Sequence, residues 1–387
     1  MRVMAMIDSL IAAGAERMAV NIANALAEAG IESHLCATRI GGPLEEFVSP
    51  DVKLFVPGKR CSRDMRAFLR LRRYIRQNGI EIIHAHSSSL FWAVMLKFTL
   101  PSLKIVWHDH FGFSDWLHVR ETFYLRMAMP FTGHSFVVNE KLMNFARERL
   151  KVSESKLSFL PNFGDLTGDR SKVEPLPGSD MKPKLVCLAN LRMQKDHDNL
   201  LDAFRLVSGR FDTARLYLVG GHFNDDYYRH ISGRIVSEPE LKGRVHILGS
   251  RNDVAAILDA CDVGILASLS EGLPVSLLEY GMTRLPVVCT EVGECSFVLD
   301  GGSCGELVPP QNSAALANAI IKVLENPEEA QAKAEKLYNR VVEYFSKDES
   351  KRLLEYTRAW SEIGSNQARL AGSWDMSRRA SEMFLFK

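Results

Sequence analysis

The chain has 387 residues, more than one hydrophobic core usually organises, so its length predicts two domains. Hydrophobic residues make up 46% of it, charged residues make up 25%, and 48 basic residues nearly balance 47 acidic ones. This composition is typical of a soluble globular protein and excludes a global positive field for nucleic acid. Any charged partner must therefore be bound by local groups.

The seven cysteines are scattered without a CxxC pair or the spacing of metal ligands. Such cysteines are typical of a reducing compartment. The N-terminal stretch carries Asp8 inside a short apolar run and lacks a small-residue cleavage site, which argues against a signal peptide. No apolar run reaches the ~20 residues that span a bilayer. We therefore expect a cytoplasmic protein.

In the first half of the chain, short apolar runs alternate with amphipathic stretches, the pattern of a parallel sheet with helices on both faces. The expected strands are residues 3–6, 33–37, 81–85, 104–107 and 135–138. The expected helices are residues 15–29, 64–77, 120–130 and 140–150. Together they predict one doubly wound domain.

Residues 164–183 are rich in proline, glycine and charge and lack an apolar period, so they read as a linker. The pattern then restarts. The expected strands are residues 184–189, 215–219, 245–248, 263–267 and 286–289, and the expected helices are 198–208, 252–259, 274–283 and 313–325. Beyond Glu325 we expect a polar helical stretch to about residue 365. Ligands of such sheets bind beyond the carboxyl ends of the strands, so two domains in tandem predict a site between them.

The segment SEGLPVSLLEYG places Glu271 and Glu279 eight positions apart. On one helix they would lie ~12 Å apart along the axis, whereas glycoside hydrolases hold their two carboxyl groups ~5–9.5 Å apart. The pair is therefore poorly placed to attack one bond. Pro274 suits the first turn of a helix, which puts Glu271 in the preceding loop and Glu279 inside the helix.

The start of this helix leaves the backbone N–H groups of Val275 and Ser276 free at its positive end. Such a helix end suits a phosphate group. The alternative for an isolated pair of this kind is a capped helix that carries two solvated acids. The surrounding sequence has to decide between the two.

Residues 265–293, ILASLSEGLPVSLLEYGMTRLPVVCTEVG, resemble the donor-binding strand-loop-helix-strand of the retaining glycosyltransferases of family four, including the Glu-x7-Glu motif. Three other segments agree in order and spacing over residues 1–325. Residues 14–17 resemble a Gly-Gly-Ala-Glu-Arg loop with Ala13 in place of the first glycine, 82–86 match a strand ending in His-x-His, and 160–162 resemble Pro-Asn-Gly with Phe163 replacing the glycine.

The resemblance implies the GT-B architecture, in which two Rossmann-like domains face each other and C-terminal helices cross back. It implies an acceptor-side domain over residues 1–165, a donor-binding domain over 184–340, and a helix and tail over 341–387 that pack on the first domain. It also implies transfer of a sugar from a UDP- or GDP-linked donor to a hydroxyl of a saccharide or lipid-linked acceptor, in cell-surface polysaccharide or glycoconjugate synthesis. Configuration would be retained, without a metal or other cofactor.

The resemblance assigns the donor site residue by residue. Glu279 would bind the ribose, and Glu271 with the adjoining loop would hold the sugar hydroxyls and the phosphate. The loop residues are Gly272, Leu273, Pro274 and Val275. Gly14 would let the backbone approach the ligand closely.

Residues 188–196, LANLRMQKD, resemble the family's Gly-Arg-Leu-x-x-x-Lys-Gly segment, whose two cations hold the diphosphate. Lys195 matches the lysine. Asn190 stands where the arginine normally lies, so we expect it to remain among the donor-binding residues and Arg192 to supply the second cation. Residues 292–297 also depart from the family, with Glu294 in place of a glycine and Phe297 in place of a glutamate. Asp196-His-Asp198 has the form of a metal motif, but a helix cap is the better interpretation.

Histidines follow two of the predicted strands in the first domain. His110 is the expected neighbour of the reacting sugar, with His108 as the alternative. His84 and His86 are more typical of structural histidines that are hydrogen-bonded within a loop. No carboxylate stands out as a nucleophile, so we expect a same-face substitution in which the leaving phosphate helps take the acceptor's proton.

The stretch 59–76 is basic and amphipathic. Arg63, Arg66, Arg70 and Arg73 share one helical face, and Met65, Phe68, Leu71 and Ile75 would face the core. The arginines indicate either contact with an anionic membrane at its inner face or a solvated helix face. The tail, with Arg378, Arg379 and apolar residues 383–386, raises the same question.

Two other classes of enzyme are the nearest alternatives: a nucleotide-sugar epimerase and an inverting transferase of the same architecture. A nicotinamide oxidoreductase would need a G-x-G-x-x-G motif after the first strand, and the sequence between Asp8 and Gly14 lacks it.

Overall fold

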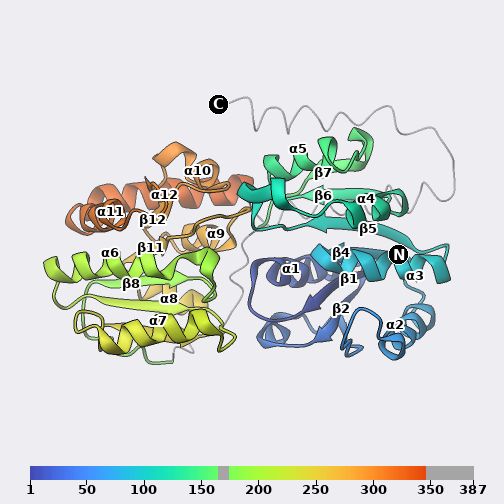
Figure 1. Cartoon of the computed structure of the whole chain (residues 1–387), viewed down its shortest axis with the longest axis horizontal. Coiled ribbons are helices and arrows are strands. Elements are labelled where there is room, and N and C mark those ends of the chain that lie inside the picture. Colours follow the sequence, from blue (N-terminus) through green and yellow to red (C-terminus); the bar gives the residue numbers. More distant parts are fainter. Residues whose placement is uncertain (164–173, 346–387) are drawn as a thin grey trace.

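The computed structural model describes residues 1–163 and 174–345. These residues form two parallel β-sheets that lie side by side, each covered by helices on both faces (Figure 1). The first sheet is built from the N-terminal half of the chain and the second from the C-terminal half.

The first sheet has seven strands in the order β3-β2-β1-β4-β5-β6-β7, and each neighbouring pair is parallel. In chain order they are Arg2–Ser9, Glu32–Ile40, Lys53–Phe55, Ile82–His86, Lys104–Asp109, His134–Val137 and Leu157–Phe159. The order reverses between β1 and β4, and crevices at such a switch point are where doubly wound sheets bind their ligands.

Helices α1 to α5 cover this sheet and span Gly14–Glu28, Met65–Gln77, Leu90–Thr99, Phe123–Ala128 and Glu140–Glu148. Alternation along β1 explains the two layers. Val3 packs with α1 on one face, while Met4 and Met6 pack with α2 to α5 on the other. Both faces are therefore apolar, as a buried parallel strand requires.

The second sheet has six strands in the order β10-β9-β8-β11-β12-β13, again all parallel. In chain order they are Lys184–Leu188, Arg215–Val219, Val245–Gly249, Val263–Leu266, Val287–Thr290 and Glu306–Val308. Helices α6 to α12 span His197–Arg210, Asp226–Ser237, Val254–Asp259, Val275–Met282, Cys295–Val298, Ser313–Glu325 and Pro327–Tyr344. The order reverses between β8 and β11, so this sheet has the same Rossmann-like topology.

The structure confirms the predicted fold class, and among the described residues every strand and helix that the sequence predicted is present within a few residues. Six elements were not predicted, and one of them, α10, has only four residues. Three of them, β3, β7 and β13, have only three residues each, too few to show a period. Helix α3 is apolar almost all round and shows no amphipathic stripe, and α7 is largely polar.

The basic helix α2 differs from its prediction at two positions, and the first is Arg63, which lies before the N-cap Asp64 and therefore outside the helix. Asp64 caps it by accepting a hydrogen bond from the Ala67 amide, and Phe68, Leu71 and Ile75 are buried as expected. Met65, predicted to face the core, is exposed because it lies in the first turn, away from the buried stripe.

Three further predictions concern the chain as a whole. The domain limits at residues 165, 184 and 340 remain predictions, and the proposed return of residues 341–387 to the first domain lies outside the described residues from 346 onward. No helix within the described ranges has the length and apolar character needed to cross a bilayer. All seven cysteines are free, and only Cys61 is exposed.

Candidate functional site

The carboxyl edges of the two sheets meet through the loops that follow β1 and β8. The Asn190 side-chain amide donates to the carbonyl of Ala12 at 2.6 Å and accepts from the Gly221 amide at 2.7 Å. Asn190, where the family has an arginine, thus joins the first domain to two strand ends of the second. This contact explains how an uncharged residue fits that position.

The loop from Ala267 to Pro274, which carries the first glutamate, is held by both domains. The Ser114 hydroxyl donates to the carbonyl of Glu271 at 2.6 Å, and the Asn162 amide donates to the carbonyl of Leu273 at 2.7 Å. Gln194 bridges the domains by donating to the carbonyls of Gly112 and Ser270. These contacts fix the loop's backbone in the position that the site uses.

Glu271 is buried, with 4% of its surface exposed. Its Oε1 atom lies 2.5 Å from Lys195 Nζ and 2.6 Å from the Ser268 hydroxyl. A buried carboxylate of this kind needs a charged partner and further hydrogen bonds. The alternative of a solvated acid is therefore wrong for Glu271, and the structure brings together the predicted acid and the predicted lysine.

Glu279 lies inside α9 and is also buried, with 6% exposed. Its Oε1 atom lies 3.7 Å from a guanidinium nitrogen of Arg17, which comes from the start of α1 in the other domain. The Arg17 guanidinium in turn rests on the ring of Phe47. Glu279 is therefore no solvated acid either, and it lies at the junction of the two domains.

The start of α9 is open to a ligand. The helix begins at Val275, one residue later than predicted, and Pro274 is its N-cap residue. Proline has no side chain that could cap a helix, so the N-cap residue itself makes no side-chain hydrogen bond to the first amides. A Cβ atom added to Gly14 would lie 3.8 Å from Val275, so the loop after β1 approaches this helix end closely.

Gly293 is a site residue that the sequence did not reveal. Its φ angle is +53°, and a Cβ atom there would lie 2.1 Å from the carbonyl oxygen of Glu271. The neighbouring Glu294 amide donates to the Gly272 carbonyl at 3.0 Å. The segment after β12 therefore packs against the Glu271 loop and supports it, and only glycine fits at position 293.

Arg192 and Lys195 flank a short 3-10 helix, Met193–Lys195, after β8. The guanidinium of Arg192 stands over the ring of Phe223. Burial raises the pKa of Glu16 on α1, and the charge of Arg192 partly opposes that rise. Glu16 and Arg17 belong to the Gly-Ala-Glu-Arg segment, which was the signal in the sequence for both.

Asp196 and His197 follow Lys195. Asp196 has a left-handed backbone conformation and caps α6 by accepting from the Asn199 amide. The prediction of a helix cap rather than a metal motif is confirmed. His197 is fully buried, and its backbone amide donates to the hydroxyl of Tyr227 at 2.8 Å. Burial, followed by the charge of Lys195, lowers the pKa of His197 to about 4.

Four histidines follow one another across the ends of β4 and β5. His84, His86 and His108 are buried within the strands, whereas His110 lies just beyond β5 and is partly exposed. The prediction that His84 and His86 are bonded within a loop is therefore wrong. His110 remains the candidate for contact with a sugar, because the ring of His108 has no exposed surface.

His86 and His110 share a hydrogen bond. Their facing nitrogens, Nδ1 of His86 and Nε2 of His110, lie 3.0 Å apart, and their ring planes differ by only 9°. The proton of this bond therefore lies in the plane of both rings. Burial lowers the pKa of His110 to about 3, so its ring is neutral at physiological pH.

Asp8 marks the end of β1 on the same edge. Its carboxylate accepts hydrogen bonds from Lys59, Thr38 and Ser88 at 2.6–2.9 Å. Burial alone would raise the pKa of Asp8, but these three hydrogen bonds outweigh burial and hold it below its usual value. This cluster could not be predicted from local patterns, because its members come from four separate segments.

Two facing Rossmann-like domains, with a pair of buried acids and two cations where their strand ends meet, define a glycosyltransferase of GT-B architecture. Residues 12–167 match the model of Glycosyltransferase Family 4, and residues 182–326 match that of Glycosyl transferases group 1. The chain belongs to this family of retaining glycosyltransferases, whose transfer step needs no metal ion.

Curated relatives and solved structures agree with the family. The chain is 23% identical over 318 residues to the UDP-Gal:alpha-D-GlcNAc-diphosphoundecaprenol alpha-1,3-galactosyltransferase of Escherichia coli, covering 74% of this chain and 78% of that one. It is 24% identical over 288 residues to the N,N'-diacetylbacillosaminyl-diphospho-undecaprenol alpha-1,3-N-acetylgalactosaminyltransferase of Campylobacter jejuni, covering 68% and 72%. Anabaena Alr3699/HepE in complex with UDP-glucose superposes with a TM-score of 0.75 at 19% identity, covering 93% of this chain and 100% of that one.

Proposed function

We propose that the protein transfers a sugar from a UDP-linked donor to a saccharide carried on a lipid diphosphate, in the synthesis of a cell-surface glycan. The observation that carries the proposal is the pair of buried glutamates on either side of the open start of α9, each beside a cation. A nucleotide-sugar has the matching order of groups: ribose, diphosphate and sugar. The two relatives named above act on diphosphoundecaprenol-linked saccharides, which supports the acceptor class.

Each residue has a task in this proposal. Glu279 accepts from the ribose hydroxyls, and Glu271 with the loop from Gly272 holds the sugar hydroxyls. Lys195 and Arg192, together with the free amides at the start of α9, stabilise the negative charge that develops on the leaving diphosphate. The Lys195–Glu271 ion pair also holds the lysine side chain in position before the donor binds.

The acceptor enters on the side of the first domain. His110, neutral and held by His86, lies beside the reacting sugar and does not act as a charged acid. We assign neither carboxylate at the described strand ends of the first domain as a nucleophile, because Asp8 is held by three hydrogen bonds and Asp109 is paired with Arg120 through both of its oxygens. We therefore infer a same-face substitution in which the leaving phosphate takes the acceptor's proton.

A lipid-linked acceptor requires contact with a membrane, and the first domain has a surface that suits one. We define the α2–α4 apolar surface by its exposed residues: Met65, Leu69, Phe91, Met95, Phe98, Phe123, Tyr124 and Met127. Exposed arginines of α2 and α4, such as Arg66, Arg73 and Arg126, lie on the same helices. Apolar side chains flanked by arginines favour the surface of an anionic bilayer over a solvated helix face.

The donor and the stereochemistry can be tested together. A thermal-shift screen against a panel of nucleotide-sugars identifies the donor, because a ligand that binds the folded state raises its apparent stability. The selected donor is then incubated with GlcNAc-diphosphoundecaprenol, and the new linkage is examined by NMR. We expect the anomeric configuration of the donor to be kept. An inverted linkage, or an epimerised donor formed without acceptor, would contradict the proposal.

Membrane contact needs its own test. Vesicles that contain anionic lipid should sediment the native chain, and a Phe123→Asp/Met127→Asp double variant should bind them at least ~10-fold more weakly, because both charges would have to be desolvated. Leu206→Asp, at an exposed leucine of α6 in the second domain, is the matched control. Equal sedimentation of all three chains would rule out the α2–α4 apolar surface as the contact.

A further inference from the structure

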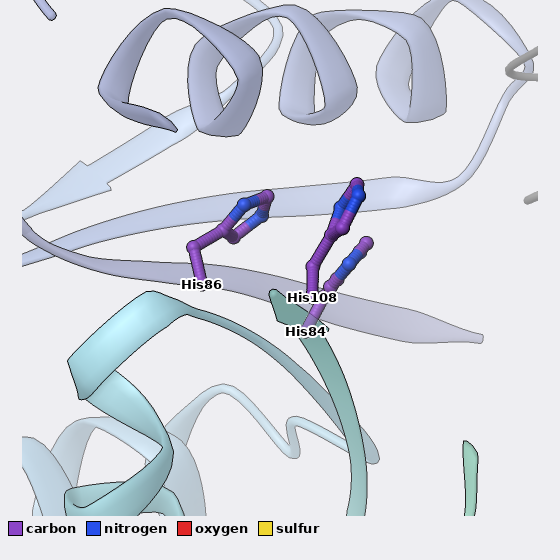
Figure 2. Close-up of side chains that lie close together, drawn as sticks. All are labelled: His84, His86 and His108. Carbon is purple, nitrogen blue, oxygen red and sulfur yellow. The ribbon is translucent and has the colours of Figure 1, made fainter. Parts of the chain in front are cut away.

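Three buried histidines of the first sheet project to the same side. His84 and His86 are two positions apart on β4, so they share a face, and His86 pairs in register with His108 of β5 (Figure 2). Each has at most 2% of its surface exposed. One ligand nitrogen from each of the three rings lies within 4.8 Å of those of the other two. We call this group the histidine trio.

Each ring of the trio has a nitrogen without a partner. Nε2 of His84, Nε2 of His86 and Nδ1 of His108 are buried and form no hydrogen bond with any residue that the structure describes. Leaving a polar atom buried in this way typically costs 1–3 kcal/mol, so three of them in one place call for an explanation. The rings are neutral, so a lone pair is available to a ligand on a ring whose other nitrogen carries the proton.

The outer nitrogens of two of these rings are already engaged. Nε2 of His108 lies 3.4 Å from the carbonyl oxygen of Leu160, and Nδ1 of His86 is bonded to His110. Metal-binding histidines typically donate their second ring N–H to a carbonyl or another acceptor, which orients the ring and fixes its tautomer. The Leu160 contact puts the proton of His108 on Nε2 and leaves Nδ1 as the ligand atom.

We propose that the histidine trio binds one transition-metal ion, with Zn²⁺ as the preferred ion. Three neutral imidazoles are a ligand set that Zn²⁺ favours, and the absence of carboxylates in the trio argues against Mg²⁺ or Ca²⁺. The ion links β4 to β5 next to His110, which is hydrogen-bonded to His86. It acts by holding His86, and through it His110, and takes no part in the transfer step.

Binding requires a small closure of the three rings. Zn–N bonds of about 2.0–2.1 Å in a tetrahedral site place the ligand nitrogens ~3.3 Å apart, so the most distant pair must approach by about 1.5 Å. Rotation of side chains supplies this movement without a shift of either strand. Three protein ligands leave one position of the ion for a water molecule.

Metal content is the direct test. The full chain, freed of any affinity tag, is produced in zinc-supplemented medium, passed over a chelating resin and analysed by elemental mass spectrometry. We expect about one zinc per chain, and less than a tenth of that in His84→Asn and in His108→Asn. His134→Asn is the matched control, since His134 is equally buried on neighbouring β6 but lies outside the trio, and it should keep the metal.

Two further readouts keep the test valid where a variant fails to fold. Cobalt added to the chelator-treated native chain should give the absorption bands of a tetrahedral ion, and Zn²⁺ should raise the melting temperature of the native chain in a way that EDTA reverses. A native chain without zinc, without cobalt bands and without a zinc-dependent shift would overturn the proposal. Equal zinc in the native chain and both trio variants would place the ion elsewhere and overturn it as well.

Discussion

The two sheets share one strand order, yet their carboxyl edges have opposite chemistry. In the second domain the edge carries charges, with Lys195 paired to Glu271 and an open helix start beside them. In the first domain the corresponding edge carries neutral, buried histidines, and its acids Asp8 and Asp109 are already paired with Lys59 and Arg120. The same topology therefore provides one edge suited to a diphosphate and one suited to an uncharged sugar and its acceptor.

The two edges are sensitive to different changes. Removing one partner of a buried ion pair destabilises the protein, because the other charge is left uncompensated in a medium of low dielectric constant. Protonation of a buried neutral imidazole also destabilises the protein, because the charged form of the ring lacks a partner. Substitutions should therefore act strongly on the charged edge, and pH should act on the neutral groups.

The largest effect is expected at Lys195. Lys195→Ala would remove the cation that we propose for the leaving diphosphate, and among the described residues it would leave Ser268 as the side-chain partner of Glu271. We expect kcat/KM to fall by about 10²–10³-fold, the usual result of losing one preorganised group that stabilises charge. Initial rates with a saturating acceptor measure it.

The matched control for Lys195 is Lys182→Ala. Lys182 is an exposed lysine that precedes β8 at the opposite edge of the same sheet. This variant should keep the native rate. Native turnover in Lys195→Ala would mean that the charged edge is not where the diphosphate is bound.

Gly293 tests whether the charged edge needs its supporting loop. In Gly293→Ala the new Cβ meets the carbonyl oxygen of Glu271, and the positive φ angle adds strain. We expect a loss of roughly 3 kcal/mol in the free energy of unfolding and a lower rate of transfer. Gly301→Ala is the control, because Gly301 has a similar φ but open space around it, so only the strain remains. Equal losses in both variants would deny the contact a role.

His197 tests whether burial alone makes a histidine sensitive to pH. It is a neutral, buried histidine in the second domain, whereas the histidine trio and His110 lie in the first. Its pKa in the folded protein is about 4, below the ordinary value of 6.5, so the unfolded chain binds more protons between these values. The stability that His197 contributes is complete above pH 6.5 and is lost as the pH falls toward 4, by about 2 kcal/mol at pH 5.

Urea unfolding at pH 7.5 and pH 5 checks the effect of His197. His197→Gln should lose less stability than the native chain between these two pH values, whatever its stability at pH 7.5. A difference between the two pH values that matches the native chain would show that the His197 ring is not held neutral.

The smallest effect is expected at Glu279. Glu279→Gln keeps the shape of the side chain but removes the charge from its hydrogen bonds to the ribose, so affinity for the nucleotide should fall by about 10-fold. Titration calorimetry with UDP measures it. Glu335→Gln, at a half-exposed glutamate of α12, serves as the control. An unchanged affinity in Glu279→Gln would count against the ribose contact.

Much of the fold could be predicted because buried parallel strands read as apolar runs between amphipathic helices. The runs at β1, β9 and β11 show this directly. Glu271 and Glu279 could be predicted because one local pattern places them in a loop and in the helix that follows it, and Lys195 because it belongs to a second local pattern after β8. Helix α3 could not, since a helix that is apolar all round has no stripe to detect.

The rest of the site depends on contacts between distant segments. The spacing of His84 and His86 predicts a shared face, but only the register of β4 with β5 brings His108 to them. Asn190 looked like a missing cation and proved to be a tie between the domains. The role of Gly293 could not be predicted from the sequence, because it depends on the lack of space for a side chain beside the Glu271 carbonyl.

We propose that the charged edge binds a nucleotide through two separate groups, with the diphosphate at Lys195 and the ribose at Glu279. Calorimetric titration of UDP and of uridine into the native chain, Lys195→Ala and Glu279→Gln tests it most directly. The account predicts that Lys195→Ala weakens binding of UDP and leaves uridine unaffected, whereas Glu279→Gln weakens both. Equal weakening of uridine by the two variants, or no weakening of UDP by either, would contradict it.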